Sequence, residues 1–164
     1  MRISVVIPAY NEEQYLPKTL ASIARLLRKP DEVIIVDGYS TDRTPQIARQ
    51  FGAKVIRARR KTIGFARQKG LEAATGDVIA ETDADTIVPP RWLTIIEQTL
   101  ARPGVAGTFG CYVAHDGKLP YRLFITLLNP IMFWLFSRFG MYIPGGQNIA
   151  FWKRQLKNGI IMLK

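Results

Sequence analysis

The sequence predicts an α/β fold in which a mostly parallel central sheet is flanked by helices on both faces. Short apolar runs alternate with segments of helical periodicity, which is the pattern of repeated strand–helix–strand units. Polar and partly acidic residues follow three of the apolar runs, at 9–12, 37–38 and 83–85. The 164 residues, 48% of them hydrophobic, suit a single domain with a substantial core.

The first two strands and the helix between them are predicted from apolar spacing. Residues 3–8 and 32–37 are apolar runs typical of buried strands. Asn11 and Gln14 have the spacing of a capping box, whereas Pro17 favours a helix that starts nearer to itself. The apolar face of this helix is predicted to hold Leu16, Leu20, Ile23, Ala24 and Leu27.

Two further strand–helix units follow. Thr44, which precedes a proline, favours a helix start, and Gly52 favours its end. Residues 54–58 are predicted to form a short strand and residues 64–74 a helix. Residues 77–82 form another apolar run, which predicts a buried strand that delivers the chain to the acidic residues after it.

The carboxyl ends of these strands are the expected ligand site. In open parallel sheets this edge collects the binding groups, so one crevice is expected to hold all three polar segments. Asp83 and Asp85 point to the same side and repel each other, and a divalent cation of the Mg²⁺ or Mn²⁺ type removes that repulsion. Water and phosphate oxygens suit the remaining coordination positions. A nicotinamide-dinucleotide site is disfavoured, because the turn at 8–13 lacks glycine and carries two carboxylates.

Several motifs together carry a family resemblance. Residues 6–13, 35–42 and 82–85 resemble the family 2 glycosyltransferases, which are inverting enzymes of the GT-A type that use nucleotide-diphosphate sugars. Further matches occur at residues 65–70, 74–77 and 144–148, in the order of the family. The resemblance implies a Rossmann-like GT-A fold with a single catalytic domain over residues 1–164. It also implies metal-dependent transfer, with inversion, of a sugar from a UDP- or GDP-linked donor to an acceptor glycan, lipid or lipid phosphate.

The resemblance also implies roles for individual residues. Asp85 would be the direct ligand of a Mg²⁺ or Mn²⁺ ion, with Asp83 as a second candidate ligand. Tyr10 would stack on the base, Asp37 would hydrogen-bond the base edge, and Arg67 would lie near the base or the phosphates. Three alternatives stay open: Tyr10 covering the sheet edge, Asp37 capping the turn that follows it, and Arg67 exposed to solvent. The substrate-binding residues implied are Pro8, Ala9, Tyr10, Glu12, Asp37, Arg67, Asp83, Ala84, Gly145 and Gly146.

The chain departs from the family where a catalytic base is expected. Many members carry a downstream acid that takes the acceptor proton, yet no Asp or Glu follows Asp116. Asp116 is a weak substitute, because His115 and Asp116 read first as a turn. We expect a chain truncated at its C-terminal side, or one that works without this base, as a phosphate acceptor would allow. The alternative function is a catalytically incomplete remnant that binds nucleotide sugar without transfer.

Charge and one apolar segment suggest where the protein acts. Lys and Arg number 23 against 13 Asp and Glu, a net charge of +10 that favours anionic partners. Within the apolar segment 121–143, the fifteen residues between Arg122 and Arg138 would extend only about 22 Å as a helix, against about 30 Å for a bilayer core, and a proline interrupts them, so a spanning helix is not expected. The segment is predicted to lie on a membrane, line an acceptor groove or pack against protein. Without a recognised nucleic-acid module, a nucleic-acid partner is not expected. Without an apolar signal region, a cytoplasmic location is expected, with peripheral contact at the cytoplasmic membrane face.

Overall fold

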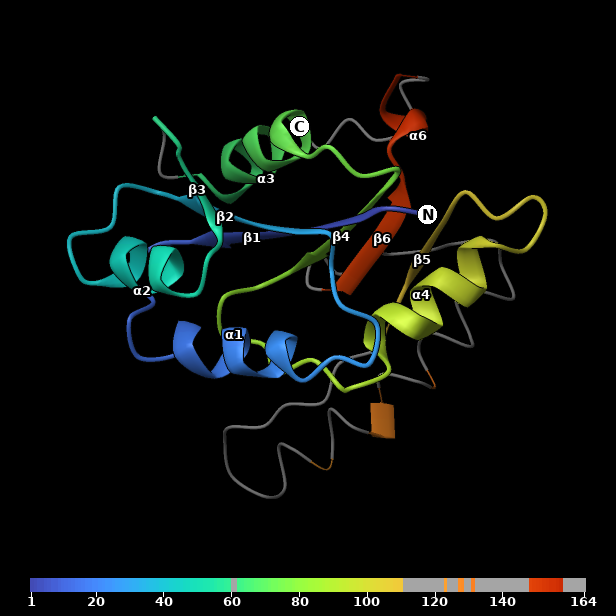
Figure 1. The fold of residues 1–164 in the computed structure, drawn as a ribbon, viewed down its shortest axis with the longest axis horizontal. Helices are drawn as coiled ribbons and strands as arrows, with labels where there is room; N and C mark the ends of the chain where they lie inside the picture. Colours follow the sequence, from blue (N-terminus) through green and yellow to red (C-terminus); the bar gives the residue numbers. More distant parts are fainter. Residues whose placement is uncertain (60–61, 111–122, 124–126, 129–130, 132–147, 158–164) are drawn as a thin grey trace.

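A central sheet organises the computed structural model, which describes residues 1–59, 62–110, 123, 127–128, 131 and 148–157. Within these residues six strands run in the order β3-β2-β1-β4-β6-β5 (Figure 1). β1 to β4 are mutually parallel, and β6 pairs antiparallel with both β4 and β5. The mostly parallel sheet predicted from the sequence is therefore confirmed. The strands are β1 (Ile3–Ala9), β2 (Glu32–Asp37), β3 (Lys54–Arg57), β4 (Val78–Thr82), β5 (Gly107–Phe109) and β6 (Asn148–Trp152).

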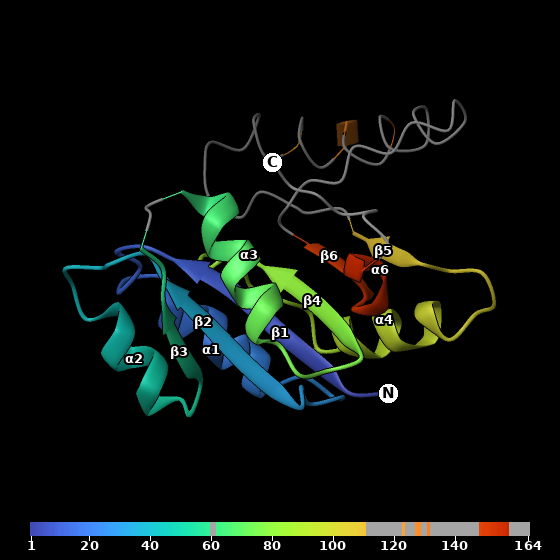
Figure 2. The same ribbon diagram turned by 90° about the horizontal axis from the view of Figure 1, so that it is seen from above.

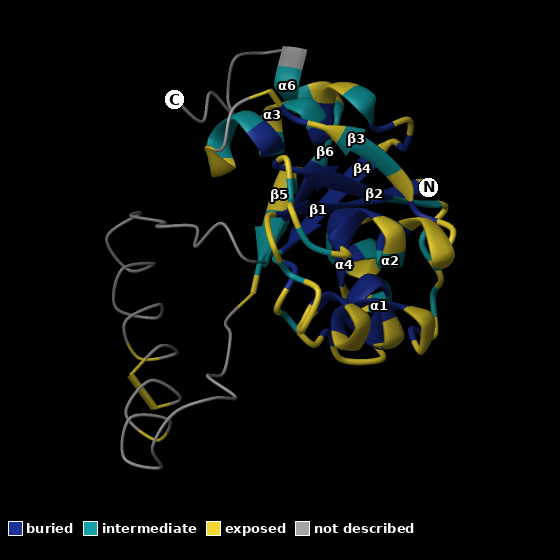
Figure 3. Cartoon of the chain, turned by 90° about the vertical axis from the view of Figure 1, so that its left-hand side faces the viewer, coloured by how far each residue is buried: buried dark blue, intermediate teal, exposed yellow. Residues whose placement is uncertain are grey.

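Helices cover both faces of the sheet (Figure 2). α1, α2 and α4 pack on one face, and α3 and α6 pack on the other. Because both faces are covered, the parallel strands are apolar on both sides, which is why they read as continuous apolar runs. Figure 3 shows β1 and β4 as the buried centre of the molecule, with β2 mostly buried and β3 more exposed. The helices are α1 (Leu16–Ala24), α2 (Thr44–Gln50), α3 (Ile63–Ala73), α4 (Trp92–Leu100) and α6 (Arg154–Lys157).

The start of α1 corrects the predicted helix cap. Asn11 does not cap this helix: the N-cap position is Tyr15, which makes no side-chain capping hydrogen bond. Asn11 instead has a positive φ of 57°, and its Oδ1 accepts a hydrogen bond from the Thr41 N–H. The Asn11 side chain therefore bonds the loop after β2 and not the first turn of α1. The alternative start near Pro17 is confirmed, since this proline lies in the first turn.

The end of α1 also differs from the prediction. The helix stops at Ala24, so Leu27 does not belong to its apolar face and is 71% exposed. Leu26 is buried in its place, and its N–H donates to the Ile23 carbonyl in the turn after the helix. Helical spacing therefore fails here because the chain has already left the helix.

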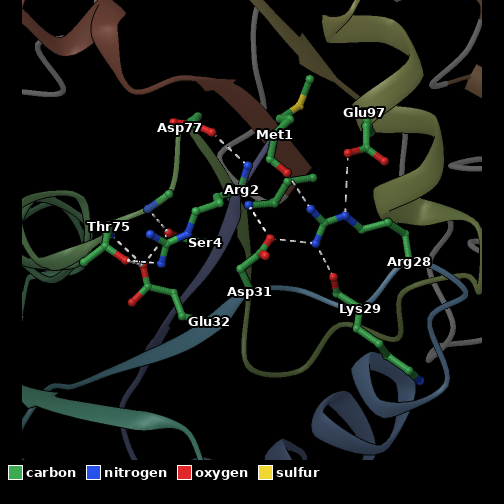
Figure 4. Close-up of polar contacts among 12 residues, drawn as sticks. Met1, Arg2, Ser4, Arg28, Lys29, Asp31, Glu32, Thr75, Asp77 and Glu97 are labelled. Carbon is green, nitrogen blue, oxygen red and sulfur yellow. Dashed lines mark hydrogen bonds and ion pairs between the residues drawn. The ribbon is translucent and has the colours of Figure 1, made fainter.

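Polar contacts tie the N-terminal ends of the strands together, on the edge opposite the strand ends that carry the acids (Figure 4). The Arg28 guanidinium donates to the Met1 carbonyl oxygen at 2.7 Å and pairs with Asp31 at 2.7 Å. Glu32 Oε1 accepts hydrogen bonds from Ser4 Oγ at 2.6 Å and from Thr75 Oγ1 at 2.7 Å. These contacts fix the register of β1 and β2 and the approach to β4.

The predicted apolar segment 121–143 is described at only four positions. All four are exposed, namely Leu123, Leu127, Leu128 and Ile131. The rest of the segment lies outside the described residues. Among the helices that the structure describes, none combines the length and the hydropathy that crossing a membrane requires.

Candidate functional site

A cavity of about 290 Å³ opens at the carboxyl ends of the parallel strands. Its wall combines residues from the loops after β1, β2 and β4 with residues from the start of α3. The three polar segments that the sequence placed at strand ends are thereby brought to one crevice. The lining residues are Pro8, Ala9, Tyr10, Glu12, Gly38, Thr62, Ile63, Ala66, Asp83, Ala84 and Asp85.

The loop after β1 is held by the loop after β2. The Asn11 N–H donates to Ser40 Oγ at 3.0 Å, and Asn11 Oδ1 accepts from the Thr41 N–H at 2.8 Å. The Glu12 N–H donates to Thr44 Oγ1 at 2.8 Å. We call this set, Asn11 and Glu12 with Ser40, Thr41 and Thr44, the loop clasp. The loop clasp fixes the backbone after β1, from which Tyr10 and Glu12 reach the cavity.

Asp42 extends the loop clasp. Its Oδ1 accepts from Thr44 Oγ1 at 2.6 Å, and its Oδ2 accepts from the Glu13 N–H at 3.1 Å. Glu13 Oε2 in turn accepts from the Arg43 N–H at 3.0 Å. Burial alone would raise the pKa of Asp42, but these hydrogen bonds outweigh it and hold the pKa below its usual range. Asp42 is therefore a fixed anion that locks both loops.

Three carboxylates share the cavity. Burial raises the pKa of Asp83, and the nearby charge of Asp85 adds to this, while Arg67 opposes it. Burial also raises the pKa of Glu12, followed by the charges of Asp85, Asp42 and Asp83. The cavity thus carries an excess of negative charge, which a cation would relieve. Among the described residues, however, no three acidic, histidine or cysteine side chains are grouped closely enough to hold a metal ion. The donor set fits a hard cation that takes its remaining oxygens from a ligand and water.

Arg67 reaches the acids of β4 from α3. Its Nη2 donates to Asp83 Oδ1 at 3.1 Å, and its Nε lies 3.9 Å from Glu81 Oε2. The side chain is only 13% exposed, so the alternative of an arginine exposed to solvent is wrong. Gly70 makes this reach possible, because a Cβ at Gly70 would stand 2.2 Å from a methyl carbon of Val6. Arg67 does not line the cavity but holds Asp83 in its wall.

Glu81 lies next to the site and was not among the residues predicted from the sequence. It is 1% exposed, and burial raises its pKa to about 7 although Arg67 opposes the shift. Its Oε1 has no hydrogen-bond partner among the described residues. A signal was present in the sequence, since a glutamate interrupts the apolar run 78–82. Buried acids of this kind are rare unless they are paired.

Asp37 is fully buried at the end of β2 and is not among the residues that line the cavity. Its Oδ1 accepts from the Ser40 N–H at 3.0 Å, so the residue does cap the turn that follows it. Its Oδ2 lies 3.5 Å from Nε of Arg57, whose guanidinium stands 5.4 Å from the ring centroid of Tyr39. Gly38, the residue directly after β2, lines the cavity, and Asp37 does not. Contact between Asp37 and a base stays a prediction.

The remaining predicted residues are placed as follows. Gly145, Gly146, His115 and Asp116 lie outside the described residues. The start of α3 contributes wall residues that were not predicted, namely Thr62, Ile63 and Ala66. Their position could have been inferred, because a helix that follows a parallel strand begins at the ligand edge of the sheet.

Comparisons with known proteins agree with this geometry. The chain is 41% identical over 91 residues to a dolichyl-phosphate hexose transferase from Haloferax volcanii, an alignment that covers 56% of this chain and 40% of that protein. It resembles glucosyl-3-phosphoglycerate synthase from Mycobacterium tuberculosis, solved in complex with Mn²⁺, UDP and glucosyl-3-phosphoglycerate. The TM-score is 0.70 and the identity 26%, covering 94% of this chain and 58% of the synthase. The chain therefore spans about half the length of these relatives.

Fold likeness extends further. The structure of S. aureus TarS 1-349 matches all of this chain and 50% of its own length, with a TM-score of 0.76 and 24% identity. These structural neighbours share the GT-A arrangement of strands and helices that the sequence motifs implied. The model of the family described as glycosyl transferase family 2 matches residues 4–150, which is most of the chain. This protein belongs to glycosyl transferase family 2.

Proposed function

We propose that this chain binds a nucleotide-diphosphate sugar, with a divalent cation, as the donor half of a sugar transferase. The observation that carries the proposal is the cavity itself, which Asp83, Asp85, Tyr10 and Gly38 line together at the ends of three parallel strands. An aromatic side chain and a bare glycine backbone suit a flat base. Two acids beside them suit a cation that carries a diphosphate.

The residue roles follow from the geometry and the family. Tyr10 and Ala9 would contact the base, and Asp37 Oδ2 would accept an N–H from its edge. Asp85, exposed in the cavity, would be the direct ligand of Mg²⁺ or Mn²⁺, with Asp83 beside it. The Mn²⁺ and UDP bound to the mycobacterial synthase support this choice of cation and donor. Bound there, the cation would offset the negative charge that accumulates on the leaving nucleoside diphosphate.

We propose inversion at the sugar and an anionic lipid as the acceptor class. In an inverting transfer the acceptor oxygen attacks the anomeric carbon from the face opposite the diphosphate. The dolichyl-phosphate acceptor in the name of the Haloferax relative supports a lipid phosphate. The net charge of +10 and the exposed Leu127 and Ile131 support contact with a membrane surface that carries such lipids.

Removal of Asp85 tests the site. We expect wild type to bind UDP in titration calorimetry with Mn²⁺ and to lose most of that affinity with a chelator. Asp85→Ala should bind weakly under both conditions, because the metal ligand is gone. Glu72→Ala, which removes an exposed acid from α3, should behave as wild type. Equal UDP affinity with and without metal would contradict the proposal, and binding without transfer to any lipid phosphate would favour the incomplete remnant.

A further inference from the structure

Arg67 is shared by Glu81 in β4 and Asp83 directly after β4, two carboxylates two residues apart that point to the same side of the chain. Asp83 Oδ1 lies 3.1 Å from Nη2, and Glu81 Oε2 lies 3.9 Å from Nε. Only Asp83 lines the cavity. Glu81 lies beneath it, one strand period further from the ligand, where solvent does not reach. Arg67 thus bridges Asp83, which can contact a ligand in the cavity, and Glu81, which cannot.

Packing between α3 and the sheet creates this arrangement. Gly70 lets α3 approach β1 so closely that any side chain there would overlap Val6. Arg67 precedes Gly70 by three residues and therefore lies on the same side of the helix. Val6 pairs with Glu81 in the register of β1 and β4. The close contact at Gly70 therefore brings the guanidinium directly over the two acids.

A glutamate at position 81 costs free energy, because its carboxyl group is buried away from water. The neighbouring strand residues are Val78, Ile79 and Ala80, all fully buried. An apolar side chain would fill the space without the desolvation that raises the Glu81 pKa. Replacing Glu81 alone would leave Arg67 its hydrogen bond to Asp83 at 3.1 Å, so the guanidinium would not become an unpaired buried charge. Stability of the fold therefore does not explain Glu81, whereas a role toward Arg67 does.

We propose that Glu81 is a positioning residue for the donor site, which holds the guanidinium of Arg67 below the cavity so that Asp83 can engage a ligand. Arg67 already donates to Asp83 at 3.1 Å, and without Glu81 the guanidinium would depend on Asp83 alone of these two carboxylates and would compete more strongly with the ligand for it. With Glu81, the charge of Arg67 stays compensated when Asp83 turns to the ligand. This inference rests on the proposed function, because the ligand is taken to be a nucleoside diphosphate with its cation.

The first test measures UDP binding in the presence of Mn²⁺. We expect Glu81→Gln to weaken binding about tenfold or more, as loss of an outer partner of a ligand residue commonly does. Glu72→Gln, the same chemical change on an exposed part of α3, should leave the affinity unchanged. In the Arg67→Ala background, Glu81→Gln should have no further effect, because it acts through Arg67. The inference would be overturned if Glu81→Gln bound UDP with wild-type affinity. It would also be overturned if the losses of binding free energy in Glu81→Gln and Arg67→Ala simply added in the double variant.

The second test separates positioning from folding. Glu81→Met should keep or raise the midpoint of thermal unfolding while weakening UDP binding as Glu81→Gln does. A loss of affinity that follows a loss of stability in both variants would overturn the inference.

A third readout needs no ligand. In the arginine side-chain ¹H–¹⁵N spectrum, the Nε–H signal of Arg67, identified by its loss in Arg67→Ala, should shift in Glu81→Gln and not in Glu72→Gln. An unshifted signal would show that Glu81 does not hold Arg67. If wild type failed to bind UDP while this signal shifted, the proposed function would fail and the Glu81–Arg67 contact would stand.

Discussion

At the scale of the residue, the two oxygens of Asp37 have different tasks. Oδ1 is engaged by the Ser40 N–H, while Oδ2 is buried with no hydrogen bond among the described residues. Oδ2 has the Arg57 guanidinium as an ion-pair partner at 3.5 Å, and a ligand N–H that met this oxygen would add the hydrogen bond that the pair does not supply. Uracil N3–H and guanine N1–H are such donors. Cytosine N3 and adenine N1 present lone pairs instead.

This asymmetry predicts the base of the donor. UDP or GDP should bind at least about tenfold more tightly than CDP or ADP, since a mismatch costs roughly 1–3 kcal/mol and 1.4 kcal/mol is a factor of ten. Asp37→Asn should flatten that preference, because the amide keeps an oxygen for the Ser40 N–H but replaces Oδ2 by a donor. The requirement for Mn²⁺ should persist in this variant. Competition among the four diphosphates measures the preference, and ADP competing as well as UDP would show that Asp37 does not read the base.

At the scale of the element, the position of α3 decides what the site contains. The helix supplies Ala66 to the cavity wall and Arg67 to the acids of β4. Its close approach depends on Gly70, where a Cβ would lie 2.2 Å from Val6 and 3.1 Å from Val36. The loop clasp fixes the facing wall in a comparable way, since hydrogen bonds between two loops replace the helix cap predicted at Asn11. Contacts between elements therefore shape both walls.

Replacing Gly70 should separate α3 from the sheet. Gly70→Ala places a methyl group against Val6, and overpacking of this kind costs typically about 1–3 kcal/mol of the free energy of unfolding. Gly64→Ala is the matched control in the same helix, because a Cβ there meets nothing within 4 Å. Urea unfolding of both variants measures the difference. Equal stability of the two would mean that α3 can shift without cost, and would contradict the close-packing argument.

At the scale of the whole molecule, the acids that line the cavity differ from Glu32 at the opposite edge of the sheet. At the ligand edge, burial raises the pKa values of Glu12 and Asp83. At the other edge, burial would raise the pKa of Glu32, but hydrogen bonds from Ser4 and Thr75 outweigh it and lower the pKa below 4.5. The acids at the ligand edge would be stabilised by a cation, whereas Glu32 at the other edge holds the strands together.

The lowered pKa of Glu32 predicts a pH-dependent stability. A carboxyl whose pKa is lower in the folded state stabilises the fold above its unfolded value of 4.5, and this contribution is lost as the pH falls through the folded value. Glu32→Gln should therefore cost about 1–3 kcal/mol at pH 7, and the difference from wild type should shrink below pH 4.5. Urea unfolding between neutral and acid pH measures it. Glu72→Gln, an exposed control, should show a smaller difference, and an undiminished gap at low pH would contradict the assignment.

The charge of the whole molecule predicts how it meets a membrane. Electrostatic attachment weakens with ionic strength, so the protein should float with anionic vesicles at low salt and be released at high salt. Neutral vesicles should not carry it. Leu127→Asp with Ile131→Asp should reduce flotation further, because both side chains are exposed and apolar. Failure to float with anionic vesicles at any salt would remove the proposed membrane contact.

The sequence by itself determined the alternation of strands and helices and the acids at the strand ends. Burial on both faces forces continuous apolar runs, and the helix between two such runs shows its own period, so both signals are local. The acids after β1 and β4 can be located in the same way, since the end of an apolar run predicts the end of a strand. Tyr10, Asp83 and Asp85 can therefore be placed at the ligand edge from the sequence alone. The order of the motifs then indicates the family.

Only the tertiary structure decided how these residues are held. The antiparallel addition of β6 and β5, the loop clasp at Asn11 and the placement of Arg67 between Glu81 and Asp83 all join segments far apart in the chain. The spacing of residues along the chain does not predict such contacts. The buried position of Glu81 likewise follows from the approach of α3 at Gly70, because a side chain's surroundings are set by the element that packs on it and not by its neighbours in sequence.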